Sequence, residues 1–162
     1  MAELTTLETK LGEVTGLAMA AQGAGEKVSG LVEDEDLRQT LDRMVKEAKE
    51  TEDRCTQLAE GLDGKKTAVL EKARETKQEA TEMMRTYLGA DADGLDGFEF
   101  LTMAEAGEVG HWSVLGVLGE KAGRSEVEEL VQWAKPIQER HLQQVLEGSL
   151  KLAAEEDPNG EA

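Results

Sequence analysis

The sequence predicts an all-α protein: a four-helix bundle with an additional helix in the long crossover between its second and third helices. Two observations carry this prediction. Aromatic residues make up 3% of the chain and proline occurs twice, whereas helix-forming residue types are abundant. Apolar residues also recur in steps of three and four along four long segments, which is the spacing of a buried helix face.

The length of the chain fits a single domain. At 162 residues it is long enough to bury a core without disulfides or an obligatory structural metal. We expect one helical bundle domain over residues 1–155. A disordered acidic tail is expected over residues 156–162, because its sequence, EDPNGEA, is polar and offers nothing to a core.

The charge of the chain argues against several classes of partner. Its formal net charge is −17, from 35 acidic and 18 basic side chains. Nucleic acids and anionic membrane surfaces are bound by clustered Lys and Arg, so we expect neither as a partner. No run approaches the ~20 apolar residues of a membrane span, and the N-terminus carries acids where a signal peptide carries bases. Because Cys55 is the only cysteine, we expect a reducing, cytoplasmic location.

The first hairpin of the bundle is expected from two helical segments. The first runs from about Glu3 to about Leu31. Its run of small residues, LAMAAQGAG, predicts close packing with another helix, either within the bundle or across a homodimer. The second segment runs from about Asp36 to Leu62, and Glu52 is the one charged residue on its apolar stripe.

The crossover and the second hairpin follow. Residues 65–88 form a weakly amphipathic stretch, rich in Lys, Glu, Ala and Thr, which predicts a surface helix connecting the two hairpins. The third bundle helix is expected over residues 96–122, ending before Gly123. The fourth is expected to run to about Glu155 from an N-cap at Ser125, with Glu128 completing a capping box.

Polar residues interrupt the apolar stripe of segment 96–122. Apolar residues at positions 101 and 104 precede a gap, and those at 115 and 118 follow it. The two stripe positions inside the gap are Glu108 and His111, and Glu105 lies one turn before Glu108. Burying such groups is unfavourable unless something binds them. This conflict is the strongest functional signal in the sequence.

A second set of polar residues lies on the facing helix. His141 is on the apolar stripe of segment 125–155, and Gln138 lies one turn before it. The short turn between the two segments makes them antiparallel neighbours, which brings the two polar sets to one height. Glu52 is expected near the middle of the bundle. The candidate ligands are therefore Glu105, Glu108, His111, His141, Gln138 and Glu52.

This combination of residue types predicts a metal site. Four-helix bundles hold metal ions with carboxylates and imidazoles that project from facing helices. Hard carboxylate oxygens with imidazole nitrogens suit iron or manganese, and zinc stays open. The alternative is a buried hydrogen-bonded network without a metal ion.

Two stretches of the chain are similar to helices of a known group. They are ETEDRCTQL, residues 50–58, and EAGEVGHWSVLGVLGEKAG, residues 105–123. With the two hairpins and the long crossover, they resemble the ferritin-like superfamily, nearest to its YciF-like stress-protein branch. The resemblance spans most of residues 5–153. It implies a ferritin-like bundle in which Glu105 and Glu108 are metal ligands.

The chain departs from this family pattern on three helices. The family's histidine on the second helix falls at Glu47, and Gln138 stands where a glutamate is expected. On the second helix the resemblance favours the acids at positions 47 and 50, whereas helical phase favours Glu52, and we give the phase more weight. The first helix offers only a weak candidate. The acids whose participation stays open are Glu13, Glu47, Glu50 and Glu52.

These observations predict a ferritin-like metal-binding protein that holds iron or manganese in the bundle core. The resemblance leaves ferroxidase or peroxide-linked chemistry, and a role in oxidative stress, open. The alternative is a non-enzymatic bundle with a degenerate site that acts as a stress-associated or partner-binding protein. Metal content distinguishes the two.

Overall fold

Five helices make up the structure, a computed structural model that describes residues 2–162. No strand occurs within this range, so the all-α prediction is confirmed. Each expected helix is present, with ends a few residues from the expected ones. The helices are α1 (Thr6–Ser29), α2 (Glu35–Glu60), α3 (Lys66–Tyr87), α4 (Gly94–Ala122) and α5 (Ser125–Ala154).

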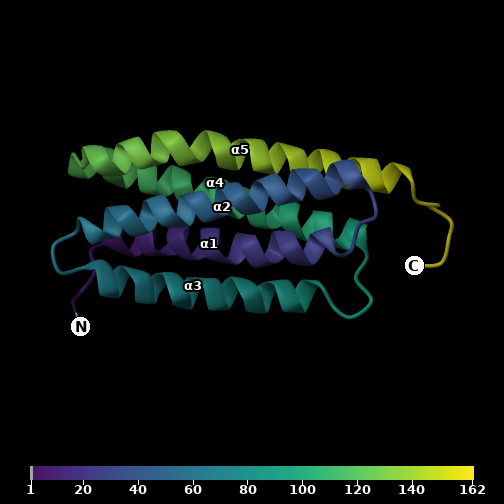
Figure 1. Cartoon of the computed structure of the whole chain (residues 1–162), viewed down its shortest axis with the longest axis horizontal. Coiled ribbons are helices and arrows are strands. Elements are labelled where there is room, and N and C mark those ends of the chain that lie inside the picture. The colour runs from purple at the N-terminus through teal and green to yellow at the C-terminus, as the bar shows by residue number, and fades with distance from the viewer. Residues whose placement is uncertain (1) are drawn as a thin grey trace.

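The helices run side by side along the long axis of the molecule (Figure 1). α1 and α2 form one antiparallel hairpin, and α4 and α5 form the other. α1 also packs against α4, and α2 against α5, so these four helices enclose a common core. α3 connects the two hairpins in the sequence; it runs back along the outside of the bundle and packs mainly against α1.

Side-chain caps fix where three of the helices begin. Thr5 and Glu8 form a capping box at the start of α1, and Asp34 accepts a hydrogen bond from the backbone N–H of Leu37 at the start of α2. Asp93 and Asp96 form a second capping box at the start of α4.

The expected capping box at Ser125 is wrong. Gly123 adopts a left-handed conformation, with φ of 62°, and closes α4. The chain therefore reverses early enough for Ser125 to be the first residue of α5. Arg124 takes the N-cap position without a side-chain cap, and its guanidinium pairs with Glu126 instead.

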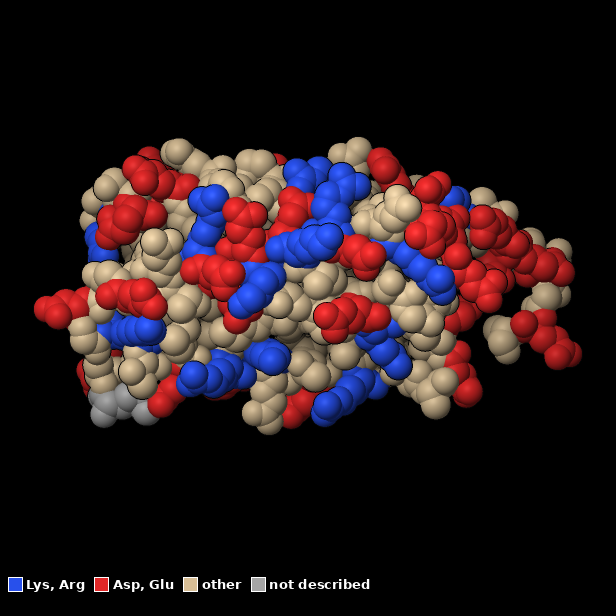
Figure 2. All heavy atoms as spheres, in the orientation of Figure 1, with Lys and Arg blue, Asp and Glu red and all other residues tan. Residues whose placement is uncertain are grey.

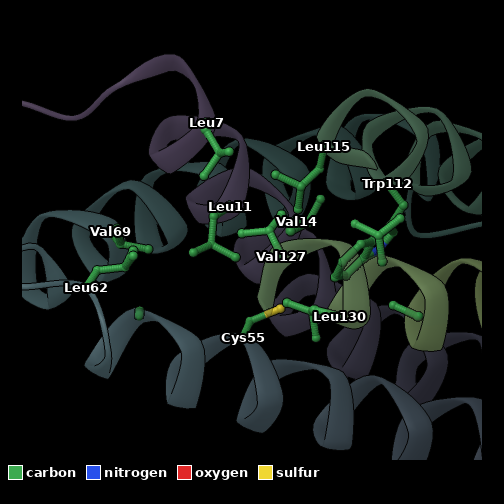
Figure 3. Close-up of a cluster of buried hydrophobic side chains, with 13 residues drawn as sticks. Leu7, Leu11, Val14, Cys55, Leu62, Val69, Trp112, Leu115, Val127 and Leu130 are labelled. Carbon is green, nitrogen blue, oxygen red and sulfur yellow. The ribbon is translucent and has the colours of Figure 1, made fainter. Parts of the chain in front are cut away.

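The apolar core consists of two clusters that lie towards opposite ends of the bundle. One is built around Leu11, Trp112 and Leu115 (Figure 3). The other is built around Leu41 and Phe98. On all four bundle helices, the buried residues between the two clusters are polar or small. This polar layer at mid-bundle is where the sequence predicts the site.

The contact between α1 and α3 depends on a glycine. A Cβ atom added at Gly16 would lie 2.3 Å from the backbone oxygen of Ala73 on α3, whereas one added at Gly23 would meet nothing within 4 Å. We expect Gly16→Ala to lower the free energy of unfolding by about 1–3 kcal/mol, because α3 has to shift. Gly23→Ala should raise it by up to about 1 kcal/mol through helix propensity alone.

Urea denaturation followed by circular dichroism measures both changes. Gly23→Ala is the matched control, because it makes the same substitution in the same helix. Equal effects of the two substitutions would contradict the close approach of α3.

Candidate functional site

The polar layer is built from four deeply buried side chains on α4 and α5. Glu105 and Glu108 come from α4 and are 3% and 4% exposed. Gln138 and His141 come from α5 and are each 1% exposed. Of the expected meeting between these two polar sets, the structure shows the contact of Glu105 with His141, whose side-chain atoms are 3.7 Å apart.

The buried face of α4 differs from the expected one. It passes through Leu101, Glu105, Glu108, Trp112 and Leu115, so Trp112 takes the inward position expected for the neighbouring histidine. The larger apolar area of the indole explains this choice, because burying it stabilises the fold more than burying an imidazole. Glu105 consequently lies fully on the buried face rather than at its edge.

His111 lies at the surface instead of in the polar layer. Its side chain is 42% exposed. Its Nδ1 lies 2.8 Å from the backbone oxygen of Gly107, one turn earlier in the same helix. Its Nε2 lies 3.7 Å from Oε2 of Glu13 on α1. The structure therefore does not bring His111 together with His141.

The imidazole of His141 stands between two carboxylates from different helices. Its Nδ1 is 3.7 Å from Oε2 of Glu105 on α4, and its Nε2 is 3.4 Å from Oε1 of Glu47 on α2. Glu47 is also ion-paired with Arg140. Burial pulls the pKa of Glu47 upwards, but the hydrogen bond from Arg140 and the proximity of His141 outweigh it and lower the pKa.

Glu47, rather than Glu52, is the acid of α2 that reaches the layer. Glu52 accepts a hydrogen bond of 2.6 Å from the side-chain amide of Gln22 and lies 3.6 Å from the ammonium of Lys49. Its side chain is 21% exposed, at the edge of the bundle. Glu50 pairs with Arg54 at the surface. The family resemblance was the signal that pointed to Glu47, and helical phase was the weaker guide.

Two buried oxygens in the layer have no hydrogen-bond partner: Oε2 of Glu105 and Oε1 of Gln138. Glu108 forms no ion pair with any side chain of residues 2–162. Burial, and then the charge of Glu105, raise the pKa of the Glu108 carboxyl well above its ordinary value. The layer thus holds acceptors without matching donors, and a cation or proton would satisfy them.

An apolar cavity gives access to these carboxyl groups. It has a volume of about 580 Å³ and lies among α1, α3 and α4, where α3 and α4 contact each other only sparsely. Glu105 and Glu108 form part of its wall, and four methionines are among the other residues that line it. The size is that of a small-molecule pocket. The methionines are Met19, Met83, Met84 and Met103.

A complete metal site is not preformed in the described part of the chain. Across residues 2–162, no three His, Cys, Asp or Glu side chains are grouped so that they could hold a metal ion as they stand.

Among the helices of residues 2–162, none combines the length and apolar character needed to cross a membrane.

Comparisons with protein-family models, with curated proteins and with solved structures found no match.

Proposed function

We propose that the polar layer binds a divalent metal ion, iron or manganese, with zinc as the third choice. Glu105, Glu108 and His141 would be the ligands, and Glu47 would close the site from α2. The single observation that carries this proposal is the pair formed by the unpartnered Glu105 Oε2 and His141 Nδ1, 3.7 Å apart inside the core.

The chemistry of this pair suits a shared cation better than a hydrogen bond. A separation of 3.7 Å is too long for a hydrogen bond. Metal–ligand bonds of about 2.0–2.2 Å allow two ligand atoms of one ion to stand at such a separation. A divalent ion would also compensate the two carboxylates on α4, neither of which pairs with a Lys or Arg side chain of residues 2–162.

A third ligand has to come from a side-chain rotation. Glu108 is the other buried acid of α4, and Glu47 would have to give up part of its pairing with Arg140. The amide of Gln138 would then orient a ligand by hydrogen bonding. When bound, iron or manganese would supply Lewis-acid or redox chemistry. A small reactant could reach the site through the cavity that Glu105 and Glu108 line.

The arrangement of the helices supports a bundle of the ferritin-like type as part of the same proposal. Two antiparallel hairpins are joined by a crossover that runs the length of the molecule. Carboxylates and a histidine project into the middle from three of the four bundle helices. In ferritin-like proteins, metal ligands occupy this place.

A second candidate function is a metal-free structural bundle. A protonated His141 would lie within ion-pair distance of both Glu47 and Glu105, so one proton serves the layer in place of a metal ion. The lack of a preformed group of three ligands within residues 2–162 favours this alternative. Competition between the proton and the metal ion gives a way to distinguish the two.

The test compares the two histidines of the chain. Protein prepared without chelators is loaded anaerobically with Fe(II) or Mn(II), and bound metal is measured by elemental analysis and by calorimetry. We expect the wild type and His111→Ala to bind one or two equivalents, and His141→Ala to bind none. Affinity should rise from pH 6 to pH 8, because ligation requires a neutral imidazole and releases protons.

Thermal unfolding followed by circular dichroism checks that each variant is folded, and His141→Gln serves as a second variant with similar volume. Wild-type protein that binds no metal after loading would overturn the proposal and leave the structural bundle. Equal loss of binding in both histidine variants would place the site elsewhere.

A further inference from the structure

The outward face of α4 carries a long stripe without charge. Between Phe100 and Gly119, no exposed residue of α4 is Asp, Glu, Lys or Arg, and the partly exposed His111 has its Nε2 towards Glu13 of α1. One third of the chain is charged, and charged side chains occur along the whole face shown in Figure 2. Three large apolar side chains on the stripe are unusually exposed: Met103 at 40%, Val114 at 47% and Val117 at 59%. Such a patch marks an interaction surface.

The stripe is symmetric about Gly110. Ala106 and Val114 lie four residues from it on either side, and Met103 and Val117 lie seven residues from it. At 3.6 residues per turn, all of these positions fall within about 40° of the direction of Gly110. An antiparallel second copy of α4 would therefore place Met103 against the partner's Val117, and Ala106 against the partner's Val114.

The charges that bound the stripe obey the same symmetry. Glu99 and Lys121 lie eleven residues before and after Gly110, and both are exposed. Neither forms an ion pair with a side chain of residues 2–162. In the antiparallel arrangement, Glu99 faces the partner's Lys121, and Lys121 faces the partner's Glu99. The stripe is thus complementary to itself in its apolar pattern and its charges.

Gly110 permits the close approach that this arrangement needs. A Cβ atom added at Gly110 would meet nothing within 4 Å, so the position is open to the outside and has no packing role within the chain. Two strongly acidic chains repel each other over most of their surfaces. A face free of acids is where such chains can meet.

We propose that a second copy of this chain docks antiparallel on α4, with a two-fold axis through Gly110 and two Glu99–Lys121 ion pairs at the ends of the stripe. Such an interface is isologous, since each residue meets its counterpart in both directions. This inference is independent of the metal proposal, because Glu105, Glu108 and His141 face the opposite side of α4 or lie on α5.

Sedimentation equilibrium tests the contact by charge reversal. We expect the wild type to approach twice the chain mass of 17.6 kDa with rising concentration. Glu99→Lys sets two lysines against each other at both ends, and should weaken the dimer by about tenfold or more. The double variant Glu99→Lys/Lys121→Glu restores both pairs and should recover the wild-type constant. Failure of the double variant to recover would overturn the antiparallel register.

A substitution on the two-fold axis gives a second test. Gly110→Glu places two carboxylates face to face and favours the α4 helix, so we expect a folded monomer. Gly23→Glu is the matched control, because it makes the same change at another open position in a helix, and it should leave the dimer intact. A wild type that stays monomeric, or a Gly110→Glu protein that stays dimeric, would overturn the proposal.

Discussion

Replacing Glu108 with methionine is expected to raise the free energy of unfolding of the metal-free protein by about 1–3 kcal/mol near neutral pH, and to abolish metal binding. Glu108 is 4% exposed and has no basic partner among residues 2–162. Methionine matches the length of glutamate and adds no buried polar atom. A residue that serves function at the expense of stability should behave in this way: its replacement stabilises the fold and abolishes binding.

Glu108 should also make the stability of the folded protein depend on pH. Burial and the charge of Glu105 raise the pKa of Glu108 in the folded state above its ordinary value of 4.5. Between the two pKa values the folded state binds more protons than the unfolded state, so stability falls as pH rises through this range. The wild type should therefore lose stability upwards from about pH 5, and the Glu108→Met protein should lose less.

Chemical denaturation at several pH values between 5 and 8 measures the two profiles. His141, Glu47 and Glu105 belong to the same layer, and they remain in both proteins. The difference between the profiles therefore reports Glu108 together with its interaction with Glu105. Glu120→Met, which removes an exposed acid from the same helix outside the polar layer, is the matched control and should leave the profile unchanged. A variant less stable than the wild type at every pH would show that Glu108 is well satisfied in the native core.

The helices and the pairing of the second hairpin could be predicted because they depend on local pattern and short turns. The inward face of α4 could not be fixed from sequence. Positions 101, 108 and 115 fit two ladders, one through His111 and one through Trp112. Only packing against α1 and α5 decides between them, and the larger apolar side chain is the one that is buried.

Which acid of α2 reaches the polar layer also depends on tertiary packing. Helical phase measures where a Cβ atom points, and Glu52 satisfies it better than Glu47 does. The glutamate side chain is long enough to reach inwards from the flank of a helix, as Glu47 does towards His141. Glu52 instead pairs with Gln22 of α1 at the edge of the bundle.

Cys55 is expected to react with iodoacetamide at pH 8 about a thousandfold more slowly than an unhindered cysteine. The residue is fully buried in the apolar cluster around Trp112. Burial, together with the charges of Glu52 and Glu108, raises the pKa of its thiol to about 12 against an opposing hydrogen bond from Thr15. Thiolate, the reactive form, is then on the order of one part in ten thousand at pH 8.

Reaction of Cys55 should therefore require opening of the core, which makes its labelling rate a measure of native stability. A metal ion held in the polar layer stabilises the folded state by mass action. At a hundred times its dissociation constant, it should slow labelling by about a hundredfold. In Glu108→Met protein the rate without metal should be lower than in the wild type, and added metal should not change it.

Rapid labelling of native protein would contradict the burial of Cys55. A rate that stays constant while metal binds would show that Cys55 is reached by a local opening that leaves the metal site intact.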